Sequence, residues 1–321
     1  MKSFKKMASI IVSLAIAVLL MYFVLAKAGF ANVPGYLSAI DFKWVVLAVA
    51  LYTVDMFIRA YRWKVILKSN NLQVGLKDSF MAYNLGNSLN IIIPAKIGDV
   101  ARSYYLKKKF GYTYPRTLPS TFLDRLFDVV GVYFVILLCS LYIVTRAKLS
   151  TWLYDIFILG IVVLVIIFIV MELLLRKSSL VGKIKNEKLR SLIYSLLEAF
   201  TGSFKDRRNF LILIGCSVVI WLCEGLFAYL IFISLEQYYN PVVVAFSTMI
   251  AVLTKVFPIT PGGIGVFEGT MVIVLAMFGY SSGSAAVAST VNHLFMNLYA
   301  VILGIYILLR ENISVSNIEL E

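Results

Sequence analysis

The sequence contains few of the residues that build metal sites, disulfide frameworks or nucleotide-binding loops. Its 321 residues include one His, three Cys and 17 Asp or Glu. A lone His, with no cysteines at ligand spacing, gives no metal-site signature, and no cofactor is expected. The motif GxxxxGK followed by Ser or Thr is absent as well, so we expect no ATP-driven chemistry of that class.

Apolar residues dominate what is present. They make up 61% of the sequence, and a soluble domain has roughly 45–50%. Apolar runs of about 20 residues, long enough for a helix to cross a bilayer, recur along the chain. We therefore predict an all-α polytopic membrane protein with about six full spans and two helical hairpins. The predicted full spans are 8–26, 44–66, 119–144, 152–175, 210–234 and 285–309.

One broken apolar motif occurs twice. Pro94-Ala-Lys-Ile-Gly-Asp99 in the first half matches Pro261-Gly-Gly-Ile-Gly-Val-Phe-Glu268 in the second half. In each copy Pro and Gly interrupt an apolar segment, and an acidic residue follows. Short segments of this kind at matching places in two halves of a membrane protein are typical of a transport site.

The spacing of the spans sets the predicted organisation. An odd number of crossings separates corresponding points of the halves 44–144 and 210–309, which predicts an inverted repeat. Each half contains a broken segment, near 79–106 or 243–277, whose arms are short for spanning, so we favour re-entrant hairpins. Broken backbone at membrane depth must be buried in protein or line a wet cavity. Hairpins that cross fully, and kinked helices that only pack, are the alternatives.

The net charge of +13 is distributed as membrane topology requires, so no nucleic-acid partner is expected. Most Lys and Arg residues fall on the side that holds the N-terminus. This asymmetry follows the positive-inside rule and predicts a cell-membrane protein with both termini in the cytoplasm. We expect a single membrane domain over 1–310, with a cytoplasmic linker at 176–209 and a short cytoplasmic tail at 311–321.

Charged residues inside the predicted membrane segments are the functional candidates. Each costs roughly 2.5–3.5 kcal/mol at mid-bilayer, even on the lenient insertion scale. Exposed N–H groups at a Gly-rich helix start favour an anion such as phosphate. The alternative is a buried network that only holds the hairpins in place. The candidate residues for a lipid head group are Lys96, Asp99, Arg102, Asp124, Arg125, Lys255, Gly262, Gly263, Gly265, Glu268 and His293.

Several of these residues have two interpretations. Asp124 and Asp128 share a helical face, which is unfavourable unless a cation such as Arg102 or Lys96 lies opposite them. Glu268 either stabilises the start of its helix or changes protonation when a ligand binds. His293 is either a hydrogen-bonded packing residue or a group that titrates near neutrality.

Three groups of residues carry a resemblance to a known family. They are Pro94, Gly98, Asp99 and Arg102; Phe122, Asp124 and Arg125; and Pro258, Pro261, Gly262, Gly263, Gly265 and Glu268. Together they resemble the lysylphosphatidylglycerol synthase transmembrane (flippase-like) family, over residues of about 5–310. That family commonly has Glu in place of Asp99 and Arg in place of His293, which weakens a phosphate-binding role for position 293. The aminoacyl-transferase domain of two-domain members is not seen, so lysine transfer from tRNA is not expected.

Three functions are compatible with these patterns. The favoured one is translocation of a phosphate-headed lipid, of phospholipid or polyprenyl-phosphate type, between membrane leaflets without ATP. The second is an enzyme acting on a lipid phosphate, for which we find no nucleophile–base arrangement or sugar-nucleotide signature. The third is a non-transporting membrane partner of a separate synthase or glycosyltransferase. We expect no enzymatic activity, and the sequence leaves homo-oligomer formation open.

Overall fold

The computed structural model describes residues 18–24, 26, 33–92, 97–144, 158, 162, 165, 169, 173, 187–255, 260–315 and 318. All regular structure in these residues is helical. The chain divides into two compact units. Unit 1 comprises Met1–Met56, Asn84–Ala101 and Trp221–Glu321, and unit 2 comprises Phe57–Tyr83 and Arg102–Ile220.

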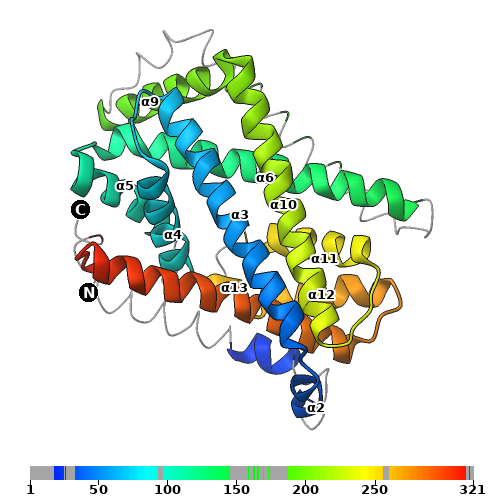
Figure 1. Ribbon diagram of the computed structural model, residues 1–321. Coiled ribbons are helices and arrows are strands. Elements are labelled where there is room, and N and C mark those ends of the chain that lie inside the picture. Colours follow the sequence, from blue (N-terminus) through cyan, green and yellow to red (C-terminus); the bar gives the residue numbers. More distant parts are fainter. Residues whose placement is uncertain are drawn as a thin grey trace. The chain divides into compact units, whose positions relative to one another are not determined.

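Within the described residues, four helices are long and apolar enough to cross a membrane (Figure 1). They are α3 (Phe42–Ser69), α6 (Tyr114–Val144), α10 (Arg207–Ser234) and α13 (Ser282–Arg310). With 28 to 31 residues each, they exceed the roughly 20 residues that a span needs. Apolar side chains such as Val46, Leu141 and Ile302 stay exposed along them, which suits contact with lipid.

The long helices confirm four of the predicted spans as apolar helices of spanning length. These are the spans at 44–66, 119–144, 210–234 and 285–309. The predicted spans at 8–26 and 152–175 lie mostly outside the described residues. A short helix, α2 (Val33–Ser38), precedes α3.

Shorter helices lie where the sequence predicts hairpins. The first break is flanked by α4 (Leu76–Ile92) and α5 (Ile97–Phe110). The second is flanked by α11 (Pro241–Thr254) and α12 (Val266–Met277), with the 3-10 turn η2 (Pro261–Gly263) between them. These helices have 12 to 17 residues, fewer than the roughly 20 that cross a bilayer core. Asp99 and Glu268 are each the third residue of the helix that follows the break.

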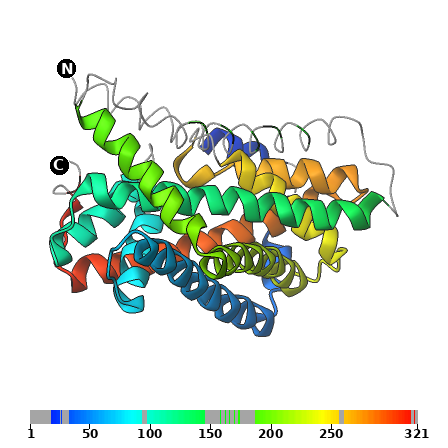
Figure 2. The same cartoon turned by 90° about the horizontal axis from the view of Figure 1, so that it is seen from above.

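Aromatic side chains join the long helices of unit 1. The Tyr52 ring on α3 lies 5.1 Å from the Phe227 ring on α10 and 5.1 Å from the Tyr299 ring on α13, measured between centroids. Helices α3 and α10 lie side by side in Figures 1 and 2. Aromatic pairs at such distances contribute about 0.5–1.5 kcal/mol beyond their buried area.

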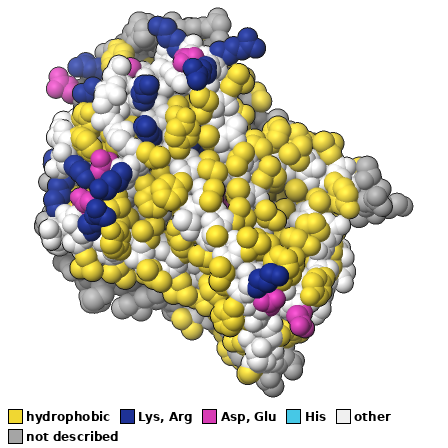
Figure 3. Space-filling view, in the orientation of Figure 1, with side chains coloured by type: hydrophobic (Ala, Val, Ile, Leu, Met, Phe, Trp, Pro, Cys, Tyr) yellow, Lys and Arg dark blue, Asp and Glu magenta, His cyan; other side chains and the backbone are white. Residues whose placement is uncertain are grey.

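The predicted linker contains a helix, α9 (Glu187–Lys205), that packs within unit 2. Its Phe200 is buried in one cluster with Ile66 of α3, Phe127 of α6 and Leu213 of α10. The Phe200 and Phe204 rings stack with centroids 4.2 Å apart. The apolar face of α9 is therefore covered by protein. Lys and Arg side chains gather over α9 and the end of α5 on the face drawn in Figure 3.

Candidate functional site

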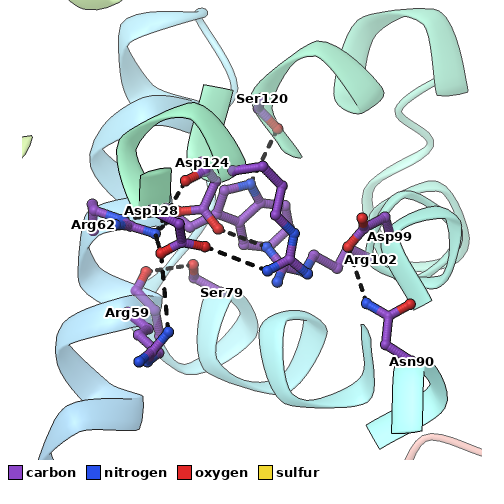
Figure 4. A network of polar contacts seen from close by, with 12 residues as sticks. Arg59, Arg62, Ser79, Asn90, Asp99, Arg102, Ser120, Asp124 and Asp128 are labelled. Carbon is purple, nitrogen blue, oxygen red and sulfur yellow. Dashed lines mark hydrogen bonds and ion pairs between the residues drawn. The ribbon is translucent and has the colours of Figure 1, made fainter. Parts of the chain in front are cut away.

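Unit 2 buries a charged network supplied by α3, α5 and α6 (Figure 4). Arg62, Arg102 and Asp124 have no exposed surface, and Asp128 is 7% exposed. Removing such charges from water costs several kcal/mol per ion, which is offset only by well-placed opposite charges and hydrogen bonds. The contacts within the network supply both.

Arg62 of α3 binds both aspartates of α6. Its Nε and Nη2 donate to Asp124 Oδ1 at 3.0 and 2.8 Å, and Nη2 also donates to Asp128 Oδ1 at 2.7 Å. Its Nη1 donates to Ser217 Oγ at 2.9 Å. The two aspartates therefore share a helical face because a buried guanidinium lies opposite. The sequence analysis expected such a cation but did not name Arg62.

Two further arginines flank the network. Arg59 Nη1 lies 4.0 Å from Asp128 Oδ1, and Arg125 Nη1 lies 3.4 Å from Asp128 Oδ2. The Arg125 side chain is 37% exposed, so this predicted site residue lies at the rim. Arg59 and Arg62 stand three residues apart inside the predicted span 44–66. That placement was the sequence signal for a buried cation site.

Arg102 of α5 is held in place but keeps one edge free. Its Nη1 donates to Asp124 Oδ2 at 2.9 Å. Its guanidinium carbon lies 3.9 Å from the centroid of the Tyr83 ring and 5.6 Å from that of Trp63. Nε and Nη2 are buried and have no hydrogen-bond partner among the described residues. These two nitrogens form an edge that can bind an oxyanion through two parallel hydrogen bonds.

In unit 1, the first motif shapes the start of α5. Asn90 Oδ1 accepts a hydrogen bond from Gly98 N at 2.9 Å, and Asn90 Nδ2 donates to Asp99 Oδ1 at 3.2 Å (Figure 4). A Cβ atom on Gly98 would overlap the carbonyl oxygen of Gly86, so glycine is what lets α5 approach α4. The predicted site residue Lys96 lies outside the described residues. Asn90 was not predicted, and no motif marks it.

The second motif shapes the start of α12. Glu268 Oε2 accepts a hydrogen bond from Gly265 N at 2.7 Å. Gly263 N and Ile264 N donate to carbonyl groups of the same turn at 3.1 and 3.2 Å. The carboxylate thus occupies the helix N-terminus, where the helix dipole favours negative charge. These N–H groups are bonded within the protein, and phosphate binding by the glycines stays a prediction.

The glycines of the second motif allow close contact with other segments of unit 1. A Cβ atom on Gly262 would lie 3.3 Å from Ile91 Cγ2 in the last turn of α4. One on Gly263 would lie 2.7 Å from Lys255 Cγ, and one on Gly265 would overlap Leu20. The last turn of α4, just before the first break, therefore lies beside the second motif in unit 1. The repeat itself stays a prediction.

Three predicted site residues meet around one aromatic ring. Glu268 Oε1 lies 2.7 Å from His293 Nδ1, and both side chains are almost fully buried. The His293 ring stacks on Phe267 with centroids 4.5 Å apart, and Lys255 Nζ lies 4.7 Å from the Phe267 centroid. The sequence analysis named Glu268, His293 and Lys255, but it did not predict these contacts.

The described residues do not gather three His, Cys, Asp or Glu side chains as a metal site would. Cys139, Cys216 and Cys223 are not joined in disulfide bonds. The groups that the structure does assemble are the free donor edge in unit 2 and the carboxylate–imidazole pair in unit 1. The first suits an oxyanion, and the second joins a carboxylate and an imidazole in the interior of unit 1.

Comparison with known proteins matches residues 10–304 to the family model described as "Lysylphosphatidylglycerol synthase TM region". A UPF0104 membrane protein of Methanocaldococcus jannaschii is 31% identical over 191 residues, which cover 59% of this chain and 79% of that protein. One of Methanothermobacter thermautotrophicus is 24% identical over 286 residues, covering 83% and 85%. Glycosyltransferase AglD of Haloferax volcanii is 23% identical over 326 residues, covering 89% of this chain and 52% of AglD.

Proposed function

Because the chain belongs to the lysylphosphatidylglycerol synthase TM region family, we propose that it moves a phosphate-headed lipid between membrane leaflets without ATP. The family and the long apolar helices make the chain a multi-pass membrane protein. The observation that carries the proposed activity is the free donor edge of Arg102. Because one relative is named a glycosyltransferase, we include a polyprenyl phosphate beside a phospholipid among the proposed substrates.

The free edge of Arg102 has the properties of an anion-binding group. A buried charged donor without a partner costs at least about 1–3 kcal/mol, which a bound oxyanion recovers. The hydrogen bond to Asp124 and the stacking on Tyr83 fix the guanidinium plane before any ligand arrives. Because the edge is preorganised, little rotamer entropy is lost when a phosphate binds.

A lipid divides naturally between this site and the bilayer. The phosphate head group binds the Arg102 edge when the packing around it opens, and the acyl or isoprenoid chains stay in contact with the apolar outer faces of the helices. The short helices around the two breaks support re-entrant hairpins, which keep broken backbone inside the protein. Arg62, in contrast, donates hydrogen bonds to Asp124, Asp128 and Ser217 and holds the network together.

The proposal places the chain in the cell membrane with both termini in the cytoplasm. The Lys107, Lys108 and Lys109 run ends α5, and α9 and the start of α10 bring further cations within the same unit. Basic side chains of this kind lie on the cytoplasmic side and contact anionic lipid. The protein acts as a carrier and not as an enzyme in this proposal.

A second candidate is a non-transporting partner of a glycan-modifying or lipid-modifying enzyme. The relative named glycosyltransferase AglD is the observation that favours it, since only about half of that protein is covered by the match. In that case the buried network is purely structural. Substitutions on the exposed side of α9 then matter more for cellular function than the donor edge of Arg102.

Leaflet exchange in proteoliposomes tests the proposal. Labelled phosphatidylglycerol and a labelled polyprenyl phosphate are followed with the wild type, Arg102→Lys and the control Arg190→Lys. Arg102→Lys keeps a positive charge beside Asp124 but removes the planar edge, so exchange should fall about tenfold or more. Arg190 is on α9, where it pairs with Glu187 near the surface, and its substitution should leave exchange unchanged.

Two results overturn the proposal. Wild-type protein that leaves the exchange of every anionic lipid at the protein-free rate supports the partner function instead. Wild-type exchange that Arg102→Lys retains in full removes the donor edge as its basis. Circular dichroism of the reconstituted proteins confirms that each variant is folded.

A further inference from the structure

Unit 1 buries the chain's single histidine against a carboxylate. His293 Nδ1 and Glu268 Oε1 are 2.7 Å apart, and the side chains are 1% and 2% exposed. The other carboxylate oxygen, Oε2, accepts the Gly265 N–H at 2.7 Å. Both oxygens of Glu268 are therefore engaged, one by the histidine and one by the Gly-rich segment. None of these contacts is needed to hold the phosphate at Arg102 in unit 2.

The second ring nitrogen of His293 can accept a proton. With the proton on Nδ1 donated to Glu268, His293 Nε2 is a bare lone pair. That atom is buried and has no hydrogen-bond partner among the described residues. The amide oxygen and nitrogen of the preceding residue, Asn292, are also buried without a partner there. Two successive residues of α13 thus place polar atoms in the interior of unit 1 without hydrogen-bond partners among the described residues.

Protonation of His293 Nε2 changes the net charge of the Glu268–His293 pair by one. Without the proton, the ionised Glu268 and the neutral His293 carry a net charge of minus one. A proton bound at Nε2 forms a new N–H bond from the ring lone pair, and the pair becomes a neutral ion pair. Loss of the proton restores the lone pair, so charge and atoms balance over a cycle.

Few other charged residues lie near the Glu268–His293 pair among the described residues. The end of α11 brings Lys255, whose Nζ lies 4.7 Å from the centroid of the Phe267 ring that stacks on His293. Helix α2, the α4 segment around Ile91 and the residues around Leu20 bring no Asp, Glu, Lys or Arg. Among the described residues of unit 1, the other buried carboxylates are Asp55 on α3 and Glu224 on α10, and each has contacts of its own.

We propose that the Glu268–His293 pair binds the proton whose movement drives lipid translocation. This inference rests on the proposed function and names its coupling ion. The link from proton to motion is the Gly265 N–H, which Glu268 holds. Gly265 abuts Leu20, and Gly262 of the same segment abuts Ile91 of α4. A change in the net charge of the Glu268–His293 pair therefore acts where the Gly262–Gly265 segment meets α4 and Leu20.

The first experiment asks whether a pH gradient drives exchange. Lipid exchange is measured in proteoliposomes of phosphatidylcholine with labelled phosphatidylglycerol or polyprenyl phosphate, with and without an imposed gradient. Wild-type net movement should respond to the gradient, and a protonophore should abolish that response. Glu268→Gln and His293→Gln should both lose the response. Glu224→Gln, which removes a different buried carboxylate of the same unit, should keep it.

The second experiment observes the proton without transport. Because the chain has one His, selective ¹⁵N labelling of histidine in a protein without a histidine tag gives one imidazole spectrum. Wild-type protein in nanodiscs should show Nδ1 protonated at alkaline pH and both nitrogens protonated at acidic pH. Glu268→Gln should shift that titration, and Glu224→Gln should not.

The two experiments separate the inference from the function beneath it. Exchange that ignores the gradient, or a His293 spectrum unchanged from acidic to alkaline pH, overturns the proton site while leaving lipid translocation standing. Absence of exchange for every lipid, with a His293 that still titrates under the control of Glu268, overturns lipid translocation and its coupling but leaves a proton-binding pair. A folded His293→Gln protein that keeps the full gradient response also overturns the inference.

Discussion

Two nitrogens of Arg62 donate hydrogen bonds to the same carboxylate oxygen of Asp124. Nε and Nη2 lie 3.0 and 2.8 Å from Oδ1. The other oxygen, Oδ2, is thereby left to accept from Arg102 at 2.9 Å. One aspartate thus holds two arginines that have different roles. Arg62 has its donors filled by protein, whereas Arg102 retains a free edge.

Replacing Arg62 should destabilise the protein severely. Arg62→Met leaves Asp124 and Asp128 buried and close together without their main cation. Breaking a buried ion pair by removing one partner costs about 3–5 kcal/mol. Unfolding in detergent micelles should show this loss. Arg190→Met on α9 removes an ion pair in which Arg190 Nη2 lies 3.7 Å from Glu187 Oε1. Because the Glu187 side chain is 87% exposed, this change should lower the free energy of unfolding by less than about 1 kcal/mol. Equal losses in the two variants would contradict the assignment of Arg62 as the centre of the network.

Gly98 should tolerate no side chain. A Cβ atom there overlaps the Gly86 carbonyl oxygen and crowds Asn90, so Gly98→Ala must separate α4 from α5. Overpacking of this kind costs about 1–3 kcal/mol. Gly215 of α10 is the matched control because a Cβ atom there meets nothing within 4 Å. Gly215→Ala should raise stability by up to about 1 kcal/mol, as expected in a helix interior. Thermal unfolding of both proteins in the same detergent measures the difference, and a stable Gly98→Ala protein would argue against the close approach.

The long helices were predictable because run length alone identifies a span. Apolar segments at 44–66, 119–144, 210–234 and 285–309 carry that information locally. The position of α9 was not predictable in the same way. Its periodic apolar residues indicate a helix with one buried face, but whether that face meets lipid or protein depends on the rest of the fold. In the structure, Phe200 and Phe204 pack against other helices of unit 2.

The site was predictable as a set of residues but not as a set of contacts. The cost of burying charge pointed to Asp124, Arg102 and Glu268 from the sequence alone. Their partners are distant in sequence, since Arg62 lies 62 positions from Asp124 and His293 lies 25 positions from Glu268. Arg62 lies near one end of the apolar segment 44–66, where a cation is ordinarily explained by membrane topology.

Asn90 should control the start of α5. Its amide accepts from Gly98 N and donates to Asp99 Oδ1, and a conservative Asn90→Leu change removes both contacts while keeping a similar volume. Loss of a capping contact costs about 0.5–2 kcal/mol. Hydrogen exchange of the Gly98 amide should accelerate, while amides in the middle of α13 should keep their protection. Unchanged protection at Gly98 would show that the hydrogen bond contributes nothing to the helix start.

Gly265 should be required both for its backbone angle and for its contact with Leu20. Its φ of 82° lies in the left-handed region, where an alanine costs about 1–2 kcal/mol. Gly279 has a φ of 83° and open space around its Cβ position, so Gly279→Ala measures the backbone cost alone. Gly265→Ala adds an overlap with Leu20 and should be the more destabilised of the two. Adding Leu20→Gly should recover part of that excess in thermal unfolding, with a coupling of about 0.5–3 kcal/mol. Equal stability of the two alanine variants, or no recovery in the double variant, would mean that α12 does not begin in contact with the helical segment around Leu20.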